Sequence, residues 1–272
     1  MRSLVQRRPY DTDMSDAEWE IYQKVFPELT GIPGVSEPKT TTRELLNAIR
    51  YQERTGCQWR NLPHDLPPSS TVKSHYYEWL YKGLFEKFRQ YVVKEVRTQE
   101  GRPNPPTACA IDSQSVKTTE MGGPKGNDNG KKTKGRKRHI LVDVLGLVLA
   151  VLITGADVQD RDGGAAVLRQ AKVEYPTIKM AAVDNAYNGI FEDVCRDLEV
   201  KIEKKSKPEG TPGFVPIRIR WVVERTFGWI NWYRRLSKDS ERTIESSQAR
   251  FDIAIGMTLT ARLCGKKIRF RH

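Results

Sequence analysis

The order of apolar segments after residue 106 limits most strongly how this chain can fold. Three strand-like segments come first, at 107–116, 139–146 and 147–156. The segments that follow are a helix at 162–173, a strand at 178–187, a helix at 189–198, a short strand at 200–207, and helices at 217–236 and 245–264. Three consecutive strands followed by alternating helices and strands predict an α/β fold, with a mixed five-stranded sheet flanked by helices.

The first hundred residues show a different pattern. Apolar residues at helical spacing predict helices at 16–26, at 42–55, and from Ser70 to about Val96. The sequence GRPNPP at 101–106 has the composition of a linker. We therefore expect a small all-helical domain over residues 1–100 and an α/β domain over residues 107–272.

Positive charge is concentrated in two blocks. Residues 101–138 hold 9 Lys and Arg against 3 Asp and Glu, and residues 201–272 hold 17 against 7, whereas residues 139–200 hold 5 against 10. The formal net charge of the chain is +12. Clustered cations favour a polyanionic partner, because each neutralised phosphate releases condensed counterions. The alternative is that these charges only keep the protein in solution.

Other classes of protein find no support in the sequence. It has no apolar run long enough to span a membrane, and its N-terminal residues lack the apolar core of a secretory signal. The four cysteines lie far apart and form no CxxC pair, so neither a zinc knuckle nor a set of disulfides is expected. We expect a protein of a reducing cytoplasm.

Three acidic residues stand where a charge is costly or specifically placed. Asp112 follows Ala110 and Ile111 within a predicted strand, and Asp184 ends the apolar run AAV. A charge at such positions is unfavourable unless it is paired or binds a metal ion. Glu224 lies on the helix predicted at 217–236. Each acid could instead be solvated, cap a turn or pair with a nearby arginine.

Three carboxylates from separate elements are the ligands that a two-metal centre needs. Mg²⁺ prefers oxygen ligands and keeps coordination sites for substrate phosphates. Two such ions can activate an attacking oxygen and stabilise a leaving one. A carboxylate pair of the kind found in glycosidases fits poorly with the two basic blocks. We therefore favour phosphoryl transfer on a nucleic acid.

At these residues the chain resembles the DDE transposases of bacterial insertion sequences, in the insertion-sequence-five group. The matching blocks, in order, are NAIRYQERTGCQWRNLP (47–63), PPSSTVKSHYYEWLYKGLFE (67–86), AIDSQSVKT (110–118), GKKTKGRKRHILVDVLGLVLAVLITGADVQDRDG (130–163), AVDNAYNG (182–189) and RWVVERTFGWINWYRRLSKDSE (220–241). They extend over nearly the whole chain.

This resemblance implies an RNase H-like fold with Asp112, Asp184 and Glu224 as catalytic metal ligands. It also implies Mg²⁺ or Mn²⁺ as cofactor, as two ions, and transposon-end and target DNA as substrates. A homodimer or a larger synaptic complex is expected because two ends must meet. A bacterial, nucleoid-associated location follows from the same resemblance.

Some positions depart from the family pattern. Ile217 and Asn231 stand where the superfamily often has a tyrosine and a lysine, so those DNA contacts are not carried over. Asn185 stands where a basic or other polar residue is common. The group often reads Asp-Tyr-Glu where this chain has Asp239, Ser240 and Glu241. None of these departures affects the three carboxylates.

The basic residues near the predicted site are candidates for DNA contact. The run KKTKGRKR at 131–138 is expected to be a mobile loop that binds phosphate, or else a solvated insert. The cations assigned to DNA are Lys117, Lys131, Lys132, Lys134, Arg136, Lys137, Arg138, Arg220, Arg225, Arg234 and Arg235.

The role of the helical region is left open between two interpretations. It could read a transposon end in the manner of a helix-turn-helix domain, with Arg50, Arg54, Arg60 and Lys73 on phosphates. It could instead serve packing or dimerisation. For the whole chain we expect a DNA transposase. The alternatives are a catalytically silent DNA-binding regulator derived from one, and a plain RNase H-like nuclease.

Overall fold

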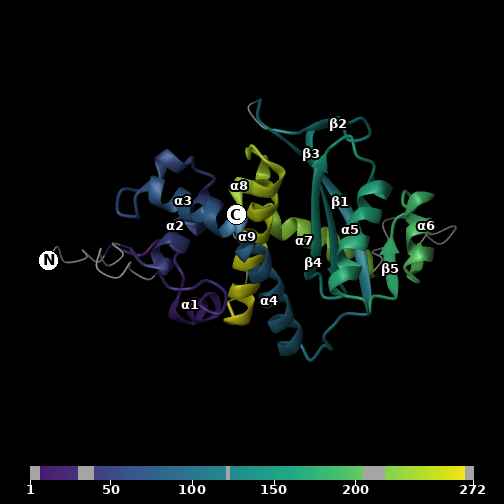
Figure 1. Ribbon diagram of the computed structural model, residues 1–272, viewed down its shortest axis with the longest axis horizontal. Coiled ribbons are helices and arrows are strands. Elements are labelled where there is room, and N and C mark those ends of the chain that lie inside the picture. Colours follow the sequence, from purple (N-terminus) through teal and green to yellow (C-terminus); the bar gives the residue numbers. More distant parts are fainter. Residues whose placement is uncertain (1–6, 30–39, 121–122, 205–217, 267–272) are drawn as a thin grey trace.

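The computed structural model describes residues 7–29, 40–120, 123–204 and 218–266. A mixed sheet lies on one side and a group of helices on the other, with a long helix from the C-terminal part of the chain between them (Figure 1). Within the described residues, none of the helices is long and apolar enough to span a bilayer.

The sheet is centred on β1 (Ala108–Lys117), which lies between β3 (Thr133–Asp143) and β5 (Met180–Val183). β3 runs antiparallel to β1 and to β4 (Val148–Gly155). β5 runs parallel to β1 and to β6 (Lys201–Lys204). These five strands confirm the predicted mixed sheet, in the RNase H-like arrangement that the resemblance implies.

A sixth strand was not predicted. The short β2 (Gly126–Asp128) pairs with the first residues of β3, and β3 itself begins at Thr133. The expectation that the basic run at 131–138 is a mobile loop is therefore wrong from Thr133 onward. The lysines and arginines lie in the first half of β3, and its second half is mostly apolar. The basic run therefore extends a strand that the apolar residues hold in the sheet.

Helices cover both faces of the sheet. α5 (Asp160–Glu174) packs on β1, β3 and β4 and against α6 (Ile190–Asp197), whereas α7 (Arg218–Ile230) packs on β1, β3 and β5. Ser113 bonds to Asp160 of α5, and its neighbour Gln114 bonds to Asn231, just after α7. Because consecutive residues of a strand point to opposite faces, α5 and α7 lie on opposite faces.

The helical part is built from both ends of the chain. It contains α1 (Asp16–Tyr22), α2 (Thr42–Thr55), the 3₁₀ turn η1 (Trp59–Asn61), α3 (Ser69–Tyr81), α4 (Leu84–Gln99) and the C-terminal α9 (Ile244–Leu263). α9 packs along α4 and also contacts α1, α2, α3 and β4. Residues 1–100 therefore do not enclose their core alone, and the division at 101–106 stays a prediction about folding units.

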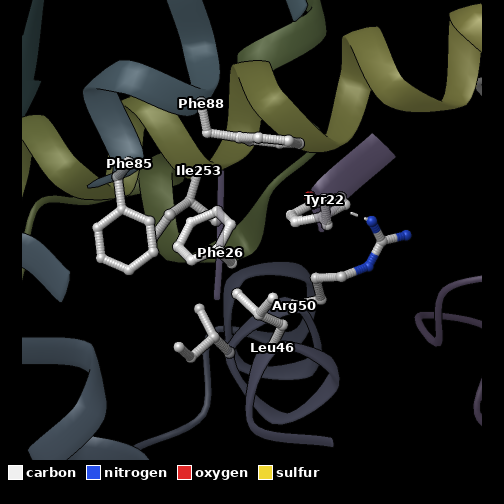
Figure 2. A pocket seen from close by; sticks show the side chains of 8 residues that line it. Tyr22, Phe26, Leu46, Arg50, Phe85, Phe88 and Ile253 are labelled. Carbon is white, nitrogen blue, oxygen red and sulfur yellow. Dashed lines mark hydrogen bonds between the residues drawn. The ribbon is translucent and has the colours of Figure 1, made fainter. Parts of the chain in front are cut away.

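The core of the helical part is tightly packed. Figure 2 shows a cavity of ≈ 10 Å³ in this core, between aromatic and aliphatic side chains of α1, α2, α4 and α9 and of the residues after α1. That volume is about what one water molecule needs. The lining residues are Tyr22, Phe26, Leu46, Ile49, Arg50, Phe85, Phe88 and Ile253. The cavity is a packing defect and cannot accept an organic ligand.

Two predicted helices are broken in the structure. The helix expected from Ser70 to Val96 ends at Tyr81 and restarts at Leu84, because Gly83 adopts φ +67°, a left-handed conformation that interrupts a helix. The helix expected at 217–236 is α7 followed by the short α8 (Arg234–Ser237). Position 217 itself lies outside the described residues.

Candidate active site

The register of the central strands aligns the two aspartates. β1 and β5 are parallel, and Ala108 pairs with Met180, Cys109 with Ala181 and Ala110 with Ala182. Asp112 and Asp184 each lie two residues beyond the last of these pairs. Adjacent strands are about 4.8 Å apart. Asp112 on β1 and Asp184 just after β5, which are 72 positions apart in the sequence, are therefore brought to the same level of neighbouring strands.

Asp112 points to the face that carries α7. Gln114, two residues along β1, lies on the same face, and it is bonded to Asn231 and to Arg138 of β3. The Asp112 carboxylate is half-buried and accepts a hydrogen bond from the Ser113 backbone N–H at 2.7 Å. The backbone of Asp112 pairs with Ile140 of β3, which fixes the position of this residue in the sheet.

Asp184 lies where β5 ends. Its Oδ1 accepts the Ala186 backbone N–H at 2.9 Å, which forms a turn directly after the strand. The strand predicted at 178–187 is therefore shorter, and ends at Val183. The turn leaves the carboxylate half-buried at the end of the strand, open on one side. This is the position at which parallel α/β sheets usually place functional side chains.

Tyr187 lies within electrostatic range of both predicted aspartates. Its ring packs edge-on against Phe191, with centroids 5.2 Å apart, and its buried hydroxyl has no partner among the described residues. Burial raises the pKa of this phenol well above 10, and the negative charges of Asp112, Asp160 and Asp184 raise it further. One hydroxyl thus experiences the field of both predicted ligands.

Glu224 is carried by α7, which is fixed against the sheet. Thr226 Oγ1 donates to the Gly146 carbonyl at 2.7 Å, and Arg225 Nη2 donates to the Leu145 carbonyl at 2.7 Å. Both bonds tie the helix to the turn between β3 and β4. Glu224 itself is half-buried, and its helix contacts the two strands that carry or precede the aspartates.

The carboxylates are not already gathered into a closed cage. Within the described residues, no three His, Cys, Asp or Glu side chains lie close enough to hold one ion. Mutual repulsion opposes the close approach of ionised carboxylates. The donor set nevertheless suits a hard cation, because it consists of oxygens alone. His139 lies on the α5 face, with its ring against Gly163.

Part of the basic run serves the fold and is not available to DNA. Arg136 and Arg138 are 0% and 1% exposed. Arg136 forms an ion pair of 2.9 Å with Asp239, and Arg138 donates to the Leu236 carbonyl at 2.8 Å. The expectation that these two arginines contact phosphate is corrected by their burial. Direct contact with DNA would require these two side chains to leave the buried face of β3.

Lys137 belongs to a polar cluster on the α5 face. Its ammonium lies 2.9 Å from Asp160 and 3.2 Å from Asp128, and only 4% of the residue is exposed. Ser113 and Ser115 of β1 donate to the same two aspartates at 2.7 and 2.6 Å. The assignment of Lys137 to DNA is likewise corrected. The sequence alone gave no sign of this cluster.

The remaining predicted cations reach the surface to different extents. Lys117, Lys131, Lys132, Lys134 and Arg234 are exposed. Lys131 lies 3.8 Å from Asp160.

Two arginines of the C-terminal block are partly covered, and one lies outside the description. Arg225 is half-buried between Trp221 and Trp229, with its guanidinium 4.9 and 4.7 Å from their ring centres. Arg235 is held by Glu241. The side chain of Arg220 lies outside the described residues.

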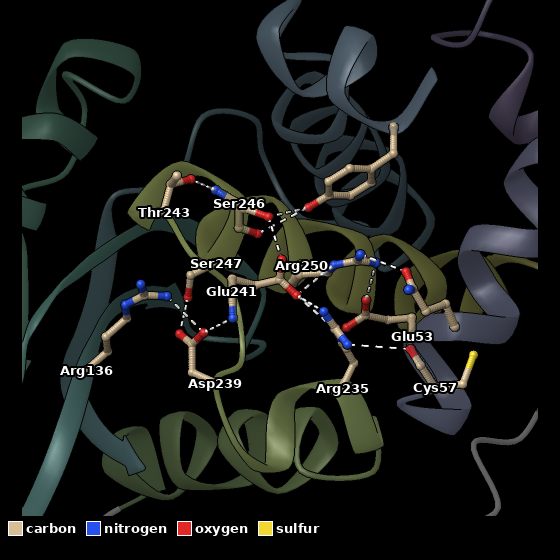
Figure 3. A network of polar contacts seen from close by, with 12 residues as sticks. Glu53, Cys57, Arg136, Arg235, Asp239, Glu241, Thr243, Ser246, Ser247 and Arg250 are labelled. Atoms are coloured by element: carbon tan, nitrogen blue, oxygen red, sulfur yellow. Dashed lines mark hydrogen bonds and ion pairs between the residues drawn. The ribbon is translucent and has the colours of Figure 1, made fainter. Parts of the chain in front are cut away.

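Figure 3 shows a network that sequence reasoning did not anticipate. Glu241 accepts bonds from Arg235 and Ser246, and lies 3.4 Å from Arg250 of α9. Arg250 also reaches Glu53 of α2 at 3.3 Å. The family pattern at Asp239 and Glu241 was the available signal. These two acids are buried structural partners of arginines.

Comparison with known proteins identifies the family of the chain. The family described as "Transposase DDE domain" matches residues 103–259, more than half of the chain. A family described as "Putative transposase of IS4/5 family" matches residues 14–89. The catalytic core domain of BIV integrase aligns with a TM-score of 0.32 and 16% identity, covering 57% of this chain and 81% of that one.

Two curated relatives match over shorter stretches. The putative transposase for insertion sequence element IS402 of Burkholderia cepacia is 32% identical over 143 residues, 47% of this chain. The uncharacterized protein y4sN of Sinorhizobium fredii (strain NBRC 101917 / NGR234) is 30% identical over 82 residues, 30% of this chain. The alignments span 64% of the length of each relative. By the domain matched over more than half of its length, the chain belongs to the DDE transposase family.

Proposed function

We propose that this protein is a DNA transposase that cleaves strands at the ends of an insertion sequence and joins them to target DNA. Asp112, Asp184 and Glu224 are its catalytic ligands. The observation that carries the proposal is the register of β1 and β5, which brings Asp112 beside Asp184. The helix of Glu224 packs on the face toward which Asp112 points. Family membership supports the same assignment.

The three carboxylates would differ in how they bind the metal ions, because they are held in place to different degrees. Asp112, in the middle of the sheet, would be shared by two Mg²⁺ or Mn²⁺ ions, while Asp184 and Glu224 would each bind one. Two divalent ions would supply an activated water and neutralise charge on the scissile phosphate. The rigid sheet position of Asp112 orients the site, and the turn at Asp184 lets that carboxylate adjust.

Exposed cations around this end of the sheet would hold the DNA backbone. Lys117 is the last residue of β1, and Lys131, Lys132 and Lys134 lie on the β2–β3 hairpin. Phosphate contacts of this kind position a duplex without reading its sequence. We further propose that the protein acts as a homodimer or a larger complex, because joining requires two ends in one assembly.

A cleavage assay with labelled end DNA tests the proposal. We expect the wild type to cut only with Mg²⁺ or Mn²⁺ present. Asp112→Asn should bind the same DNA with unchanged affinity and lose cutting by at least about 100-fold, since one ligand of the charge-neutralising centre is gone. Asp162→Asn, an exposed aspartate of α5, is the matched control and should cut normally.

The assay also separates the alternatives. A wild type that binds the DNA but never cuts it would identify a silent regulator. Cutting without any joined product would identify a nuclease. Undiminished cutting by Asp112→Asn would refute the assignment of the site.

A further inference from the structure

Eight exposed cations lie around the junction between the helical part and the sheet. We call them the junction ridge: Arg54, Arg60, Lys117, Lys132, Lys134, Arg234, Lys238 and Arg242. They come from α2, η1, the end of β1, the β2–β3 hairpin, α8 and the segment after α8. None of them forms an ion pair with another residue that the structure describes.

Close contacts join the end of α2, at one side of the ridge, to α8. Gly56 ends α2 with φ +74°, and a Cβ there would lie 3.2 Å from the Arg234 backbone. Arg235 Nη1 donates to the Cys57 carbonyl at 3.5 Å. Arg54 and Arg60 therefore lie on the segment that packs against α8, which carries Arg234. Figure 1 shows α8 between the helical part and the β2–β3 end of the sheet.

Main-chain bonds join α8 to the sheet. The Asp239 N–H donates to the Lys117 carbonyl at 2.9 Å, and Thr119 N–H donates back to the Asp239 carbonyl at 3.2 Å. Lys117 is in turn opposite Gly135 of β3, next to Lys134. Lys238, which precedes Asp239, therefore lies next to the end of β1. Lys117 at that end lies next to the lysines of the hairpin.

The acids beneath this surface are already neutralised. Asp239 pairs with buried Arg136, and Glu241 pairs with Arg235 (Figure 3). Asp128 of β2 pairs with Lys137. At the sheet end, exposed Glu120 lies 4.0 Å from Lys125, which is not one of the eight cations. The outward cations thus keep an uncompensated positive charge.

We infer that the junction ridge is the binding surface for a DNA duplex. The duplex crosses from the helical part over α8 to the β2–β3 hairpin. This inference rests on the proposed function and adds to it the path of the substrate. One continuous duplex would then contact both parts of the protein at once.

Buried contacts of Arg250 beneath the ridge hold α2 and the segment after α8 at a fixed separation. Arg250 of α9 is fully buried and bonds to Gln52 of α2 at 2.7 Å, as well as to Glu53 and Glu241. Residues of α2 and of the segment after α8 therefore share one side chain. A surface whose charges are already in place loses less entropy when a rigid duplex binds.

The salt dependence of binding tests the ridge. The probe is a fluorescein-labelled 30-base-pair duplex of arbitrary sequence, titrated by anisotropy in Ca²⁺ and 50 to 200 mM KCl. The full-length triple variant Arg60→Gln, Lys238→Gln, Arg242→Gln removes one cation from each of three ridge segments. Its control is Lys94→Gln, Arg169→Gln, Lys179→Gln, three exposed cations on α4, on α5 and before β5.

Each phosphate contact contributes about 0.9 to the slope of log affinity against log salt. We expect the slope of the ridge variant to be smaller by about 3 than that of the wild type. Over the fourfold salt range it would then lose roughly 40-fold less affinity. The control variant should keep the wild-type slope, and both variants should keep the wild-type melting temperature.

Two contrary results have different meanings. If the ridge variant keeps the wild-type slope, the duplex does not lie on the ridge, although the proposed function stands. If the wild type binds no duplex, or if single-stranded RNA competes better than the duplex, both the ridge and the proposed function fail.

Discussion

Glu53 is a buried carboxyl whose ionisation should weaken the fold. It lies on α2, its Oε1 has no partner within the described part of the chain, and its contact with Arg250 is long at 3.3 Å. Glu241 receives the better bonds of Arg235 and Ser246, and its pKa is lowered although burial opposes this. Glu241 therefore carries the charge that balances Arg250, and Glu53 is the surplus acid.

The magnitude follows from the pKa. Burial raises the pKa of Glu53 from 4.5 to about 7. The folded state therefore holds one more proton than the unfolded state between these values. The contribution of Glu53 to stability is fully present below pH 4.5 and is lost as pH rises through 7. A shift of this size corresponds to about 3 kcal/mol of unfolding free energy.

Urea unfolding of the wild type and of Glu53→Gln at pH 5, 6, 7 and 8 measures this contribution. Glutamine keeps the shape and cannot ionise. We expect the stability of the variant relative to the wild type to rise by about 2.5 kcal/mol from pH 5 to pH 8. Other titrating groups cancel in this difference. Glu20→Gln, at an exposed position of α1, should show no trend. A flat difference for Glu53→Gln would refute the reasoning.

Two further substitutions probe the packing beside the predicted site. Tyr187→Phe removes a buried hydroxyl that has no partner among the described residues, so it should raise the unfolding free energy by about 1 kcal/mol in urea; a loss of stability would mean that the hydroxyl is bonded in solution. Gly164→Ala would place a Cβ 2.4 Å from Tyr187 Cε1, so it should cost about 1–3 kcal/mol and slow cutting by displacing the ring near Asp184; wild-type stability would contradict this contact.

The periodicity of apolar residues was enough to predict most of the elements and their order, but not the short β2. α2 has the predicted limits, Thr42–Thr55, because a good amphipathic pattern ends at a glycine that can adopt positive φ. The mixed sheet was predictable because strands joined through a helix usually run parallel, whereas strands joined by a short turn run antiparallel. The helix break at Gly83 was missed because the apolar spacing continues through it.

The fate of individual charges could not be predicted from the sequence. Arg136 and Arg138 belong to a run that looks solvated, since arginine is seldom fully buried without a partner. The Asp239 side chain and the Leu236 carbonyl that accept their bonds lie about a hundred residues later in the chain. Only the folded structure brings these partners together. The positions of Asp112 within a strand and of Asp184 beside one were predictable, because each residue follows a run of apolar residues.

Diffraction from crystals grown with Mn²⁺ and end DNA tests the central claim most directly. The anomalous signal of manganese locates the ions without reference to protein density. We predict peaks bound by Asp112, one shared with Asp184 and one with Glu224, roughly 4 Å apart. Manganese bound elsewhere, or at Asp112 with Asp184 and Glu224 both turned away, would contradict the account.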